Sequence, residues 1–241
     1  MTENQIQVIE ANYNAVLKKI EFAARRAGRL PEDIQLVVVS KRKSVEVIEE
    51  AYDAGARIFG ENYPEQTLPK IEALKTKNIE WHMIGHLQSR KAEIVADHFS
   101  LLHSLDSTKL ANKLNTILLN RGKQLRVLLE VNVSGEMSKE GWAAWDENVW
   151  PDLIIAFGKL LELPGLKVEG LMCMPPYSLD PENSRPVFVK LRRFQAYLMK
   201  GLGEAYWKDL SIGTSHDYSV AIEEGARYIR VGQAILGERE T

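Results

Sequence analysis

Hydrophobic and polar positions follow two different rhythms along this chain. Between residues 3 and 27 apolar side chains recur every three or four positions, which predicts an amphipathic helix that stops at Gly28. From residue 34 onward, short and almost continuously apolar runs alternate with helix-like segments, a pattern typical of parallel strands covered on both faces. The expected strands are residues 34–40, 57–63, 80–87, 100–107, 125–134, 167–174, 209–215 and 227–236. The expected helices between them are residues 44–55, 64–76, 90–97, 108–121, 144–162, 183–201 and 217–225.

Eight strands separated by seven helices predict an α/β fold, a (β/α)8 TIM barrel. The last expected strand ends near Leu236, so we expect no final helix, and the N-terminal helix should cover the groove left open. A flat doubly wound sheet is the alternative, but no dinucleotide-type glycine fingerprint follows the first strand. Without a linker-like stretch, we expect a single domain over residues 1–241, with an N-terminal helix at 1–28 and a barrel at 34–237.

Composition and charge argue against several classes of function. The sequence has 31 basic and 33 acidic residues, a net charge of −2, which gives no electrostatic basis for nucleic acid binding. Because no run of eighteen apolar residues occurs and the first residues are polar and acidic, we expect neither a membrane span nor a signal peptide. The single cysteine, Cys173, cannot form an internal disulfide. These features predict a cytoplasmic protein.

In a barrel of this kind, functional groups gather where the strands end. The seventh strand ends in Gly213, Thr214 and Ser215, and the eighth ends in Gly232. Backbone N–H groups and small hydroxyls at these two positions often bind phosphate. Each stretch alone could be an ordinary turn or a helix cap, but the occurrence of both favours a phosphate site.

Lys41 ends the first strand, where a desolvated amine near positive charge has a lowered pKa and can form a Schiff base. A lysine opposite a phosphate site indicates either pyridoxal phosphate (PLP) or a phosphorylated sugar. Arg230 lies two residues before Gly232, so both face the same side of the strand. Facing a pyridine nitrogen, Arg230 would keep that nitrogen unprotonated. The alternative is an ion pair, for example with Glu130.

Other polar residues support weaker interpretations. His82 and His86 are four apart, which would place them on one face of a strand, but no carboxylate or cysteine stands at ligand spacing, so no metal site is predicted. Glu130 and Asp106 are either an acid/base pair or part of an ion-pair network. Three sulfur-containing residues are expected in the core, with Met172 able to pack against a planar ring: Met172, Met174 and Cys173.

The ordered series VVVSKRK, FGENYPEQ, WHMIGHLQSRK, HSLDS, EVNVSGEMSKEG, GLMCMPP and LSIGTSHDYSVAIEEGARYIRVGQAILG resembles the pyridoxal phosphate homeostasis protein family, single-domain relatives of the alanine racemase barrel. The resemblance covers nearly the whole chain. It implies that Lys41 carries the cofactor as a Schiff base, with Asn62 beside it and Arg230 at the pyridine nitrogen. Ser215 and the Gly232-Gln233 pair would hold the phosphate. The full predicted cofactor-binding set is Lys41, Asn62, His82, Met172, Ser211, Thr214, Ser215, Arg230, Gly232 and Gln233.

The sequence departs from the family pattern near the expected phosphate. Ile212 and Thr214 stand where the family usually has methionines, and Gln233 stands where it has threonine. Arg42 and Ser44 replace a threonine and a proline beside Lys41, and Arg90 replaces an asparagine. Because Gln233 removes a hydroxyl but keeps its backbone N–H, we expect an altered grip on the phosphate.

The resemblance implies a PLP-binding protein that takes part in intracellular PLP homeostasis and has no established catalytic turnover. Racemases of this fold use a second domain that brings a tyrosine base, and 241 residues leave no room for it. The alternatives are a small PLP-dependent racemase or lyase, or a Schiff-base aldolase acting on a sugar phosphate. PLP-dependent apoenzymes are the candidate partners, and a monomer or weak dimer is expected.

Overall fold

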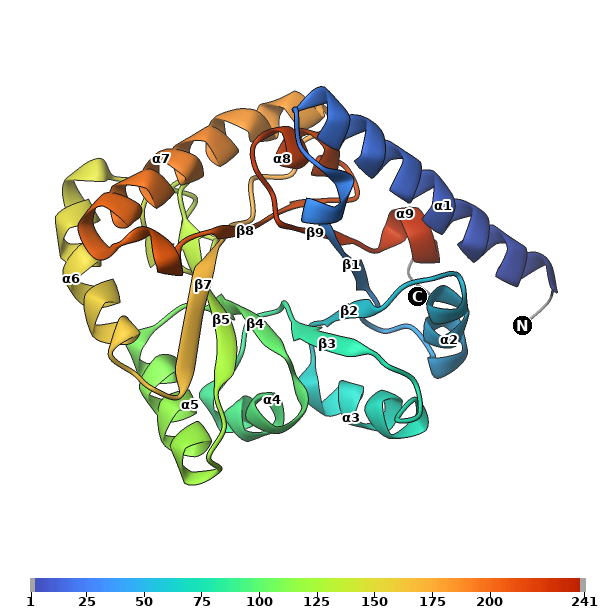
Figure 1. Cartoon of the computed structure of the whole chain (residues 1–241), viewed down its shortest axis with the longest axis horizontal. Helices are drawn as coiled ribbons and strands as arrows, with labels where there is room; N and C mark the ends of the chain where they lie inside the picture. The colour runs from blue at the N-terminus through green and yellow to red at the C-terminus, as the bar shows by residue number, and fades with distance from the viewer. Residues whose placement is uncertain (1–2, 239–241) are drawn as a thin grey trace.

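Eight parallel strands close into a barrel at the centre of the molecule (Figure 1). The computed structural model describes residues 3–238, so residues 1, 2 and 239–241 of the predicted single domain lie outside the described part. The barrel is closed by pairing of β1 with β9 and of β4 with β5. Its strands are β1 (Gln35–Val39), β2 (Ile58–Glu61), β3 (Glu80–Met83), β4 (Leu101–Leu105), β5 (Leu125–Asn132), β7 (Leu166–Met172), β8 (Asp209–Thr214) and β9 (Tyr228–Val231). The predicted (β/α)8 barrel is therefore confirmed.

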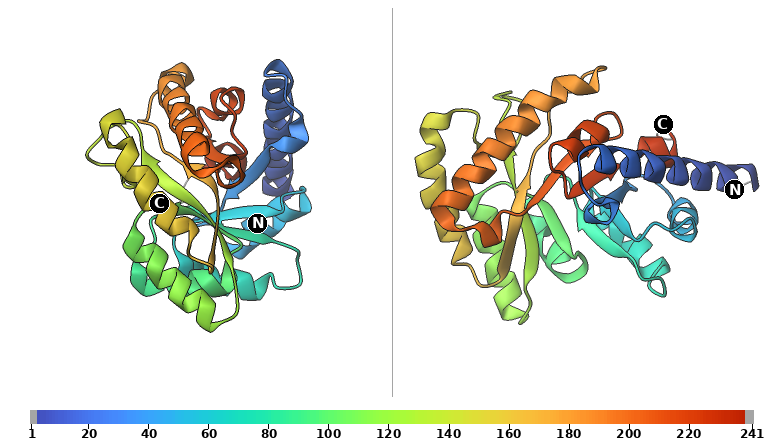
Figure 2. Two further views of the ribbon diagram at one scale, coloured as in Figure 1. Left: turned by 60° about the vertical axis from the view of Figure 1, so that its left-hand side comes forward. Right: turned by 45° about the horizontal axis from the view of Figure 1, so that its top comes forward.

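Helices surround the barrel on the outside, as both further views show (Figure 2). The helices that connect successive strands are α2 (Val45–Asp53), α3 (Pro64–Ala73), α4 (Ala92–His98), α5 (Thr108–Asn120), α6 (Trp150–Leu161), α7 (Arg185–Leu202) and α8 (Tyr218–Glu223). The N-terminal helix α1 (Glu3–Arg26) packs against α8 and against the short α9 (Gln233–Leu236). Asn12 Nδ2 donates to the Ile235 carbonyl at 3.2 Å, which ties α1 to α9. The N-terminal helix thus covers the end of the barrel wall, as expected.

Three boundaries differ from the sequence prediction by four or more residues. The last strand ends at Val231 instead of residue 236, because Gln233–Leu236 form one helical turn, too short to cover the wall. β3 ends at Met83, so the expectation that His82 and His86 share a strand is wrong. The helix expected from residue 144 begins at Trp150, because after the two-residue strand β6 (Trp142–Ala143), which pairs with β5, the chain bends and Glu147–Val149 form a 3-10 turn capped by Asp146.

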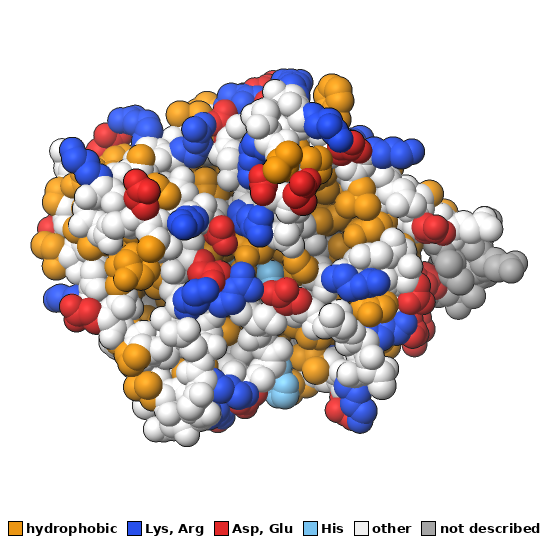
Figure 3. Space-filling model, viewed as in Figure 1, with side chains coloured by type: hydrophobic (Ala, Val, Ile, Leu, Met, Phe, Trp, Pro, Cys, Tyr) orange, Lys and Arg blue, Asp and Glu red, His pale blue; other side chains and the backbone are white. Residues whose placement is uncertain are grey.

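The buried core has two parts that lie on opposite sides of the strands. The larger part fills the space between the strands and the helices. The smaller part fills the barrel interior and consists of Val37, Leu101, Leu128, Met172 and Tyr228. Positive and negative side chains intermingle over the face shown in Figure 3, in keeping with the near-zero net charge. Among the described residues, no helix combines the length and the apolar character that a membrane crossing requires.

Candidate functional site

A cavity of about 360 Å³ opens at the carboxyl ends of the strands. Its wall comes from the carboxyl ends of β1, β8 and β9 and from the segments that follow β1, β2, β3, β7, β8 and β9, and it includes Val39, Ile84, Met174, Tyr177, His216 and Leu236. A larger depression of about 560 Å³ lies at the opposite end, around the first residues of β7 and β8. We place the site in the smaller cavity, because functional groups in this fold converge at the carboxyl ends of the strands.

Seven of the ten predicted cofactor-binding residues line this cavity: Lys41, Asn62, Thr214, Ser215, Arg230, Gly232 and Gln233. The other three, His82, Met172 and Ser211, are buried inside the barrel and do not line the cavity. Met174 lines the wall in place of Met172, because it lies two residues beyond the end of β7, at the barrel mouth, and at 40% exposure it is not the core residue that we expected. Tyr177 also lines the wall, and sequence reasoning missed it because it lies three residues beyond the predicted end of its strand.

A tight turn presents Lys41 to the cavity. Lys43 N donates to the Ser40 carbonyl at 3.0 Å, and Arg42 has a φ of 60°, in the left-handed region that is unusual for a residue other than glycine. Lys41 itself is half-buried at the cavity wall. The turn therefore directs the chain sharply away from β1 immediately after the lysine.

A buried ion pair lies directly beneath this turn. Lys70 Nζ is 2.6 Å from Glu61 Oε1 and donates to the Ser40 carbonyl at 3.0 Å, while Ser40 Oγ donates to the same Glu61 oxygen at 2.8 Å. Because Ser40 precedes Lys41 and Glu61 precedes Asn62, this network holds the ends of β1 and β2 at the cavity. Sequence reasoning missed Lys70. The only signal was its three-residue spacing with Pro64 and Thr67 on the buried face of α3.

Asn62 faces the cavity with an unused acceptor. Its Oδ1 atom is buried and accepts no hydrogen bond from any described residue. Its backbone packs closely on Gly85, where an added Cβ would lie 2.9 Å from Asn62 Cα. Since a buried acceptor without a partner is costly, Asn62 is suited to accept a hydrogen bond from a bound ligand.

The loops after β8 and β9 meet at Ser215. Its Oγ accepts from the backbone N–H groups of Gly232 at 3.3 Å and Ala234 at 3.4 Å, which leaves the hydroxyl proton to donate into the cavity. Thr214 uses both its N–H and its hydroxyl on Asp217 Oδ1, at 2.7 and 3.0 Å. Ser215 is therefore the hydroxyl of this loop that can donate to an anion.

Arg230 lies at the floor of the cavity and is almost fully buried. Its guanidinium donates to the Ser211 carbonyl at 2.7 Å, to Ser211 Oγ, to the Cys173 carbonyl at 3.2 Å and to Met174 Sδ at 2.8 Å. All four acceptors are uncharged. Among the described residues no carboxylate forms an ion pair with Arg230, so the proposed pair with Glu130 is not formed. The cavity floor therefore carries a positive charge that is not in direct contact with a carboxylate, although the charges of Glu130 and Asp217 act on it from a distance.

Glu130 lies near the carboxyl end of β5, across the barrel mouth from the loops after β8 and β9. Burial, with the nearby Asp106 charge adding to it, raises the pKa of Glu130 to about 7. His86 Nδ1 lies 2.9 Å from Asp106 Oδ2, and ligand atoms of these two residues and Glu140 lie within 4.8 Å of one another. Exposed groups of this kind are common without a metal, so this cluster alone does not establish a metal site.

Cys173 is buried, and burial raises the pKa of its thiol to about 12, as expected for an unreactive core residue.

Known proteins match nearly the whole chain. The sequence profile of the alanine racemase N-terminal domain matches residues 12–240. A pyridoxal phosphate homeostasis protein of Aquifex aeolicus is 42% identical over 226 residues, covering 93% of this chain and 96% of that protein. The structure of PipY from Synechococcus elongatus with PLP bound has a TM-score of 0.78 and 33% identity, covering 91% of this chain and 100% of that chain.

A more distant structure shows the fold alone. Alanine racemase from Streptomyces lavendulae has a TM-score of 0.71 at 16% identity, and the match covers 97% of this chain but 60% of the racemase. The shared part is the barrel. The 42% identity to a homeostasis protein over 93% of this chain, together with a racemase-type barrel that brings most of the predicted residues to its mouth, shows that this chain belongs to the pyridoxal phosphate homeostasis protein family.

Proposed function

We propose that this protein binds pyridoxal 5'-phosphate and takes part in PLP homeostasis, with the cofactor held as a Schiff base on Lys41. The observation that carries the proposal is the convergence of Lys41, Asn62, Ser215 and Arg230 on one cavity. The PLP bound in the structure of PipY, a relative at 33% identity, supports the same ligand. When bound, PLP supplies an aldehyde that condenses with amines and a ring that can accept negative charge.

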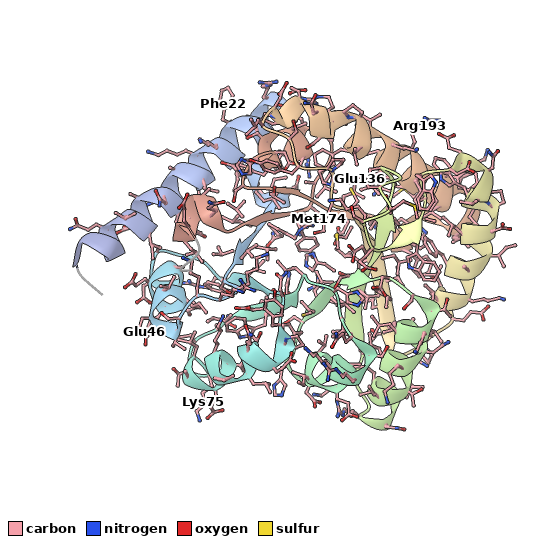
Figure 4. The ribbon with its side chains drawn as sticks, turned by 180° about the vertical axis from the view of Figure 1, so that it is seen from behind. Phe22, Glu46, Lys75, Glu136, Met174 and Arg193 are labelled. Atoms are coloured by element: carbon pink, nitrogen blue, oxygen red, sulfur yellow. The ribbon has the colours of Figure 1, made fainter. Side chains whose placement is uncertain are left out.

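Each polar group of PLP has a matching residue in the cavity. The Lys41 amine can react with the aldehyde, and the buried Asn62 Oδ1 can accept a hydrogen bond from the ring hydroxyl. Ser215 and the backbone N–H of Gln233, next to Gly232, can hold the phosphate. The cavity volume of about 360 Å³ lies within the usual range of small-molecule sites. Figure 4 shows Met174 over the barrel opening, where its side chain also contacts the Arg230 guanidinium.

Arg230 favours holding the cofactor over using it for catalysis. A guanidinium stays protonated, so at the ring nitrogen it donates a hydrogen bond without transferring its proton. The neutral pyridine ring is then a weak acceptor of negative charge. Relatives such as the Aquifex aeolicus protein are named homeostasis proteins, which supports a role without efficient turnover.

A racemase or lyase is the second candidate, and Glu130 is the observation that favours it. A carboxyl group with a pKa of about 7 at the barrel mouth is suited to move a proton at neutral pH. The loaded protein should be incubated with single amino acids in heavy water, and α-proton exchange, chirality and keto acid should be measured. Turnover near the enzyme median of roughly 10 s⁻¹ would establish the enzyme alternative. Slow exchange without net product agrees with the holding role.

Reduction of the loaded protein with borohydride, followed by peptide mass mapping, tests the covalent assignment. A pyridoxyl group is expected on Lys41, and Lys41→Ala should lose the visible absorbance of the bound cofactor. Lys43→Ala is the matched control, because Lys43 also lines the cavity but its Nζ already donates to the Glu238 carbonyl at 2.7 Å. A label on Lys43, with Lys41→Ala still coloured, would contradict the assignment.

The phosphate position can be tested separately. Ser215→Ala removes one hydrogen bond to a charged group, about 1.5–3 kcal/mol, so PLP should bind roughly 10- to 100-fold more weakly. Binding is measured by titrating PLP and following its absorbance. Unchanged affinity would place the phosphate away from the loops after β8 and β9.

A further inference from the structure

A continuous chain of hydrogen bonds crosses the barrel interior from one end to the other. Glu80 Oε1 lies 2.9 Å from His82 Nε2, and His82 Nδ1 lies 3.0 Å from His103 Nε2. His103 Nδ1 lies 2.7 Å from Ser211 Oγ, which also accepts from Arg230 Nη1. The chain therefore links a carboxylate at the start of β3 to the arginine at the cavity floor. Three of its members, His82, His103 and Ser211, are fully buried.

Both ends of this chain dictate the same direction for its protons. Arg230 can only donate, so Ser211 Oγ accepts from it and donates its own proton to His103 Nδ1. The Glu80 carboxylate can only accept, so His82 presents Nε2–H to it and accepts at Nδ1 from His103 Nε2–H. Each imidazole is then neutral, with its proton on Nε2. Every donor in the chain meets an acceptor, and none is left over.

The surroundings keep both histidines neutral. Burial lowers the pKa of His82 against the opposing effect of Glu80, and it lowers that of His103 further, with the positive charge of Arg230 adding to the effect. The Tyr228 ring packs edge-on against both imidazoles, with centroids 5.7 and 5.3 Å away. The remaining charged groups that act on the pair are Arg126 and Glu169.

The Glu80 end of this hydrogen-bond chain, which is the end away from the cavity, belongs to an ion cluster around Arg126. Arg126 donates from Nη1 to Glu80 Oε1 at 3.0 Å, from Nε to Glu169 Oε2 at 2.8 Å and from Nη2 to Tyr228 Oη at 2.7 Å. Glu80 and Glu169 are thus two carboxylates that pair with the same arginine. Of these two carboxylates, Glu80 is the one that accepts a hydrogen bond from His82.

We propose that His82 and His103 are positioning residues: through Ser211 they orient Arg230 toward the ring nitrogen of the bound cofactor, and the Glu80 carboxylate fixes the direction of the chain from the far end of the barrel. This inference rests on the proposed binding of PLP. It gives His82 and Ser211 a role beneath the cavity instead of on its wall.

The proton arrangement can be tested without cofactor. The sequence has five histidines, so the unliganded protein labelled with ¹⁵N-histidine should give five resolvable imidazoles, assigned with His82→Gln and His103→Gln. Two of them should be neutral, carry the proton on Nε2 and fail to titrate between about pH 5.5 and 8.5. A charged imidazole or an Nδ1–H form at either position would overturn the chain. This measurement stands even if Lys41 carries no cofactor.

The coupling to Arg230 can be tested on the PLP-loaded protein by a double-mutant cycle. Glu80→Gln keeps an acceptor for His82 but removes the charge that polarises the chain of hydrogen bonds, so Ser211 Oγ accepts less strongly from Arg230. The pH midpoint of the visible cofactor band should then fall by about half a unit. In a Ser211→Ala background the chain is broken, so the same change should shift the midpoint only as little as Glu169→Gln does, and Ser211→Thr should restore the larger shift.

Glu169→Gln is the matched control, because it removes an equal charge from the same cluster without touching the chain. Glu169→Gln should shift the pH midpoint of the cofactor band only slightly, and by the same amount with and without Ser211→Ala. An equal shift from Glu80→Gln with and without the Ser211 hydroxyl would show a field effect through space and overturn the proposal. If Ser211→Ala does not fold, the comparison of Glu80→Gln with Glu169→Gln in the otherwise native chain decides: equal midpoints overturn it.

Discussion

Removing Lys70 should destabilise the protein far more than a surface lysine would. Lys70→Met deletes two hydrogen bonds from a charged donor and leaves the Glu61 carboxylate, 1% exposed, without its counter-charge. Breaking one side of a buried ion pair costs about 3–5 kcal/mol, because the remaining charge stays buried and unpaired. For a chain of this size that corresponds to a fall in Tm of roughly 6–20 °C.

The assay is urea unfolding followed by circular dichroism, with the slope m compared between variants so that a changed midpoint reports stability. Lys75→Met is the control: Figure 4 shows Lys75 at the surface, its partner Glu72 is exposed as well, and such a pair contributes about 0–1 kcal/mol. The double variant Lys70→Met/Glu61→Gln should be more stable than Lys70→Met, because glutamine removes the charge and keeps an acceptor for Ser40.

Two results would refute this reasoning. One is a loss below about 1 kcal/mol for Lys70→Met, which would mean that water or rearrangement compensates Glu61. The other is a double variant less stable than Lys70→Met, which would mean that the Glu61 charge is satisfied by other groups.

Three further outcomes are expected. Ionised Glu130 disfavours the folded state, since its folded pKa of about 7 exceeds the ordinary 4.5. This cost of ionising Glu130 in the folded state is absent below pH 4.5 and complete above pH 7. Glu130→Gln should therefore raise the free energy of unfolding by up to about 3 kcal/mol at pH 8 and by little at pH 5. Equal gains at both pH values would contradict this. Gly170→Ala would place a Cβ 1.7 Å from the Asp209 carbonyl oxygen, so it should lose more than about 3 kcal/mol in urea unfolding, whereas Gly158→Ala, whose nearest neighbour is 3.5 Å away, should not destabilise. Gln233→Thr should bind PLP as tightly as the native chain or tighter in an absorbance titration, and a large loss would show that the glutamine side chain has a role of its own.

The sequence by itself determined the barrel and most of the cavity wall. Continuous apolar runs alternating with amphipathic segments specify parallel strands with helices outside, and closure brings the carboxyl ends of all strands to one rim. Lys41, Ser215 and Gly232 could therefore be assigned to one site although they are far apart along the chain. Where the pattern was short, as at β3 and after Val231, it gave the element but not its end.

Tertiary structure alone decided which polar groups meet inside the molecule. Lys70 has the sequence context of a surface helix residue, and its burial follows from the approach of α3 to the ends of β1 and β2. His82 and Ser211 belong to strands on different sides of the barrel, and only closure brings them to either side of His103. The physical reason is that periodicity reports which face of an element is buried, whereas a hydrogen bond depends on what a distant element places opposite that face.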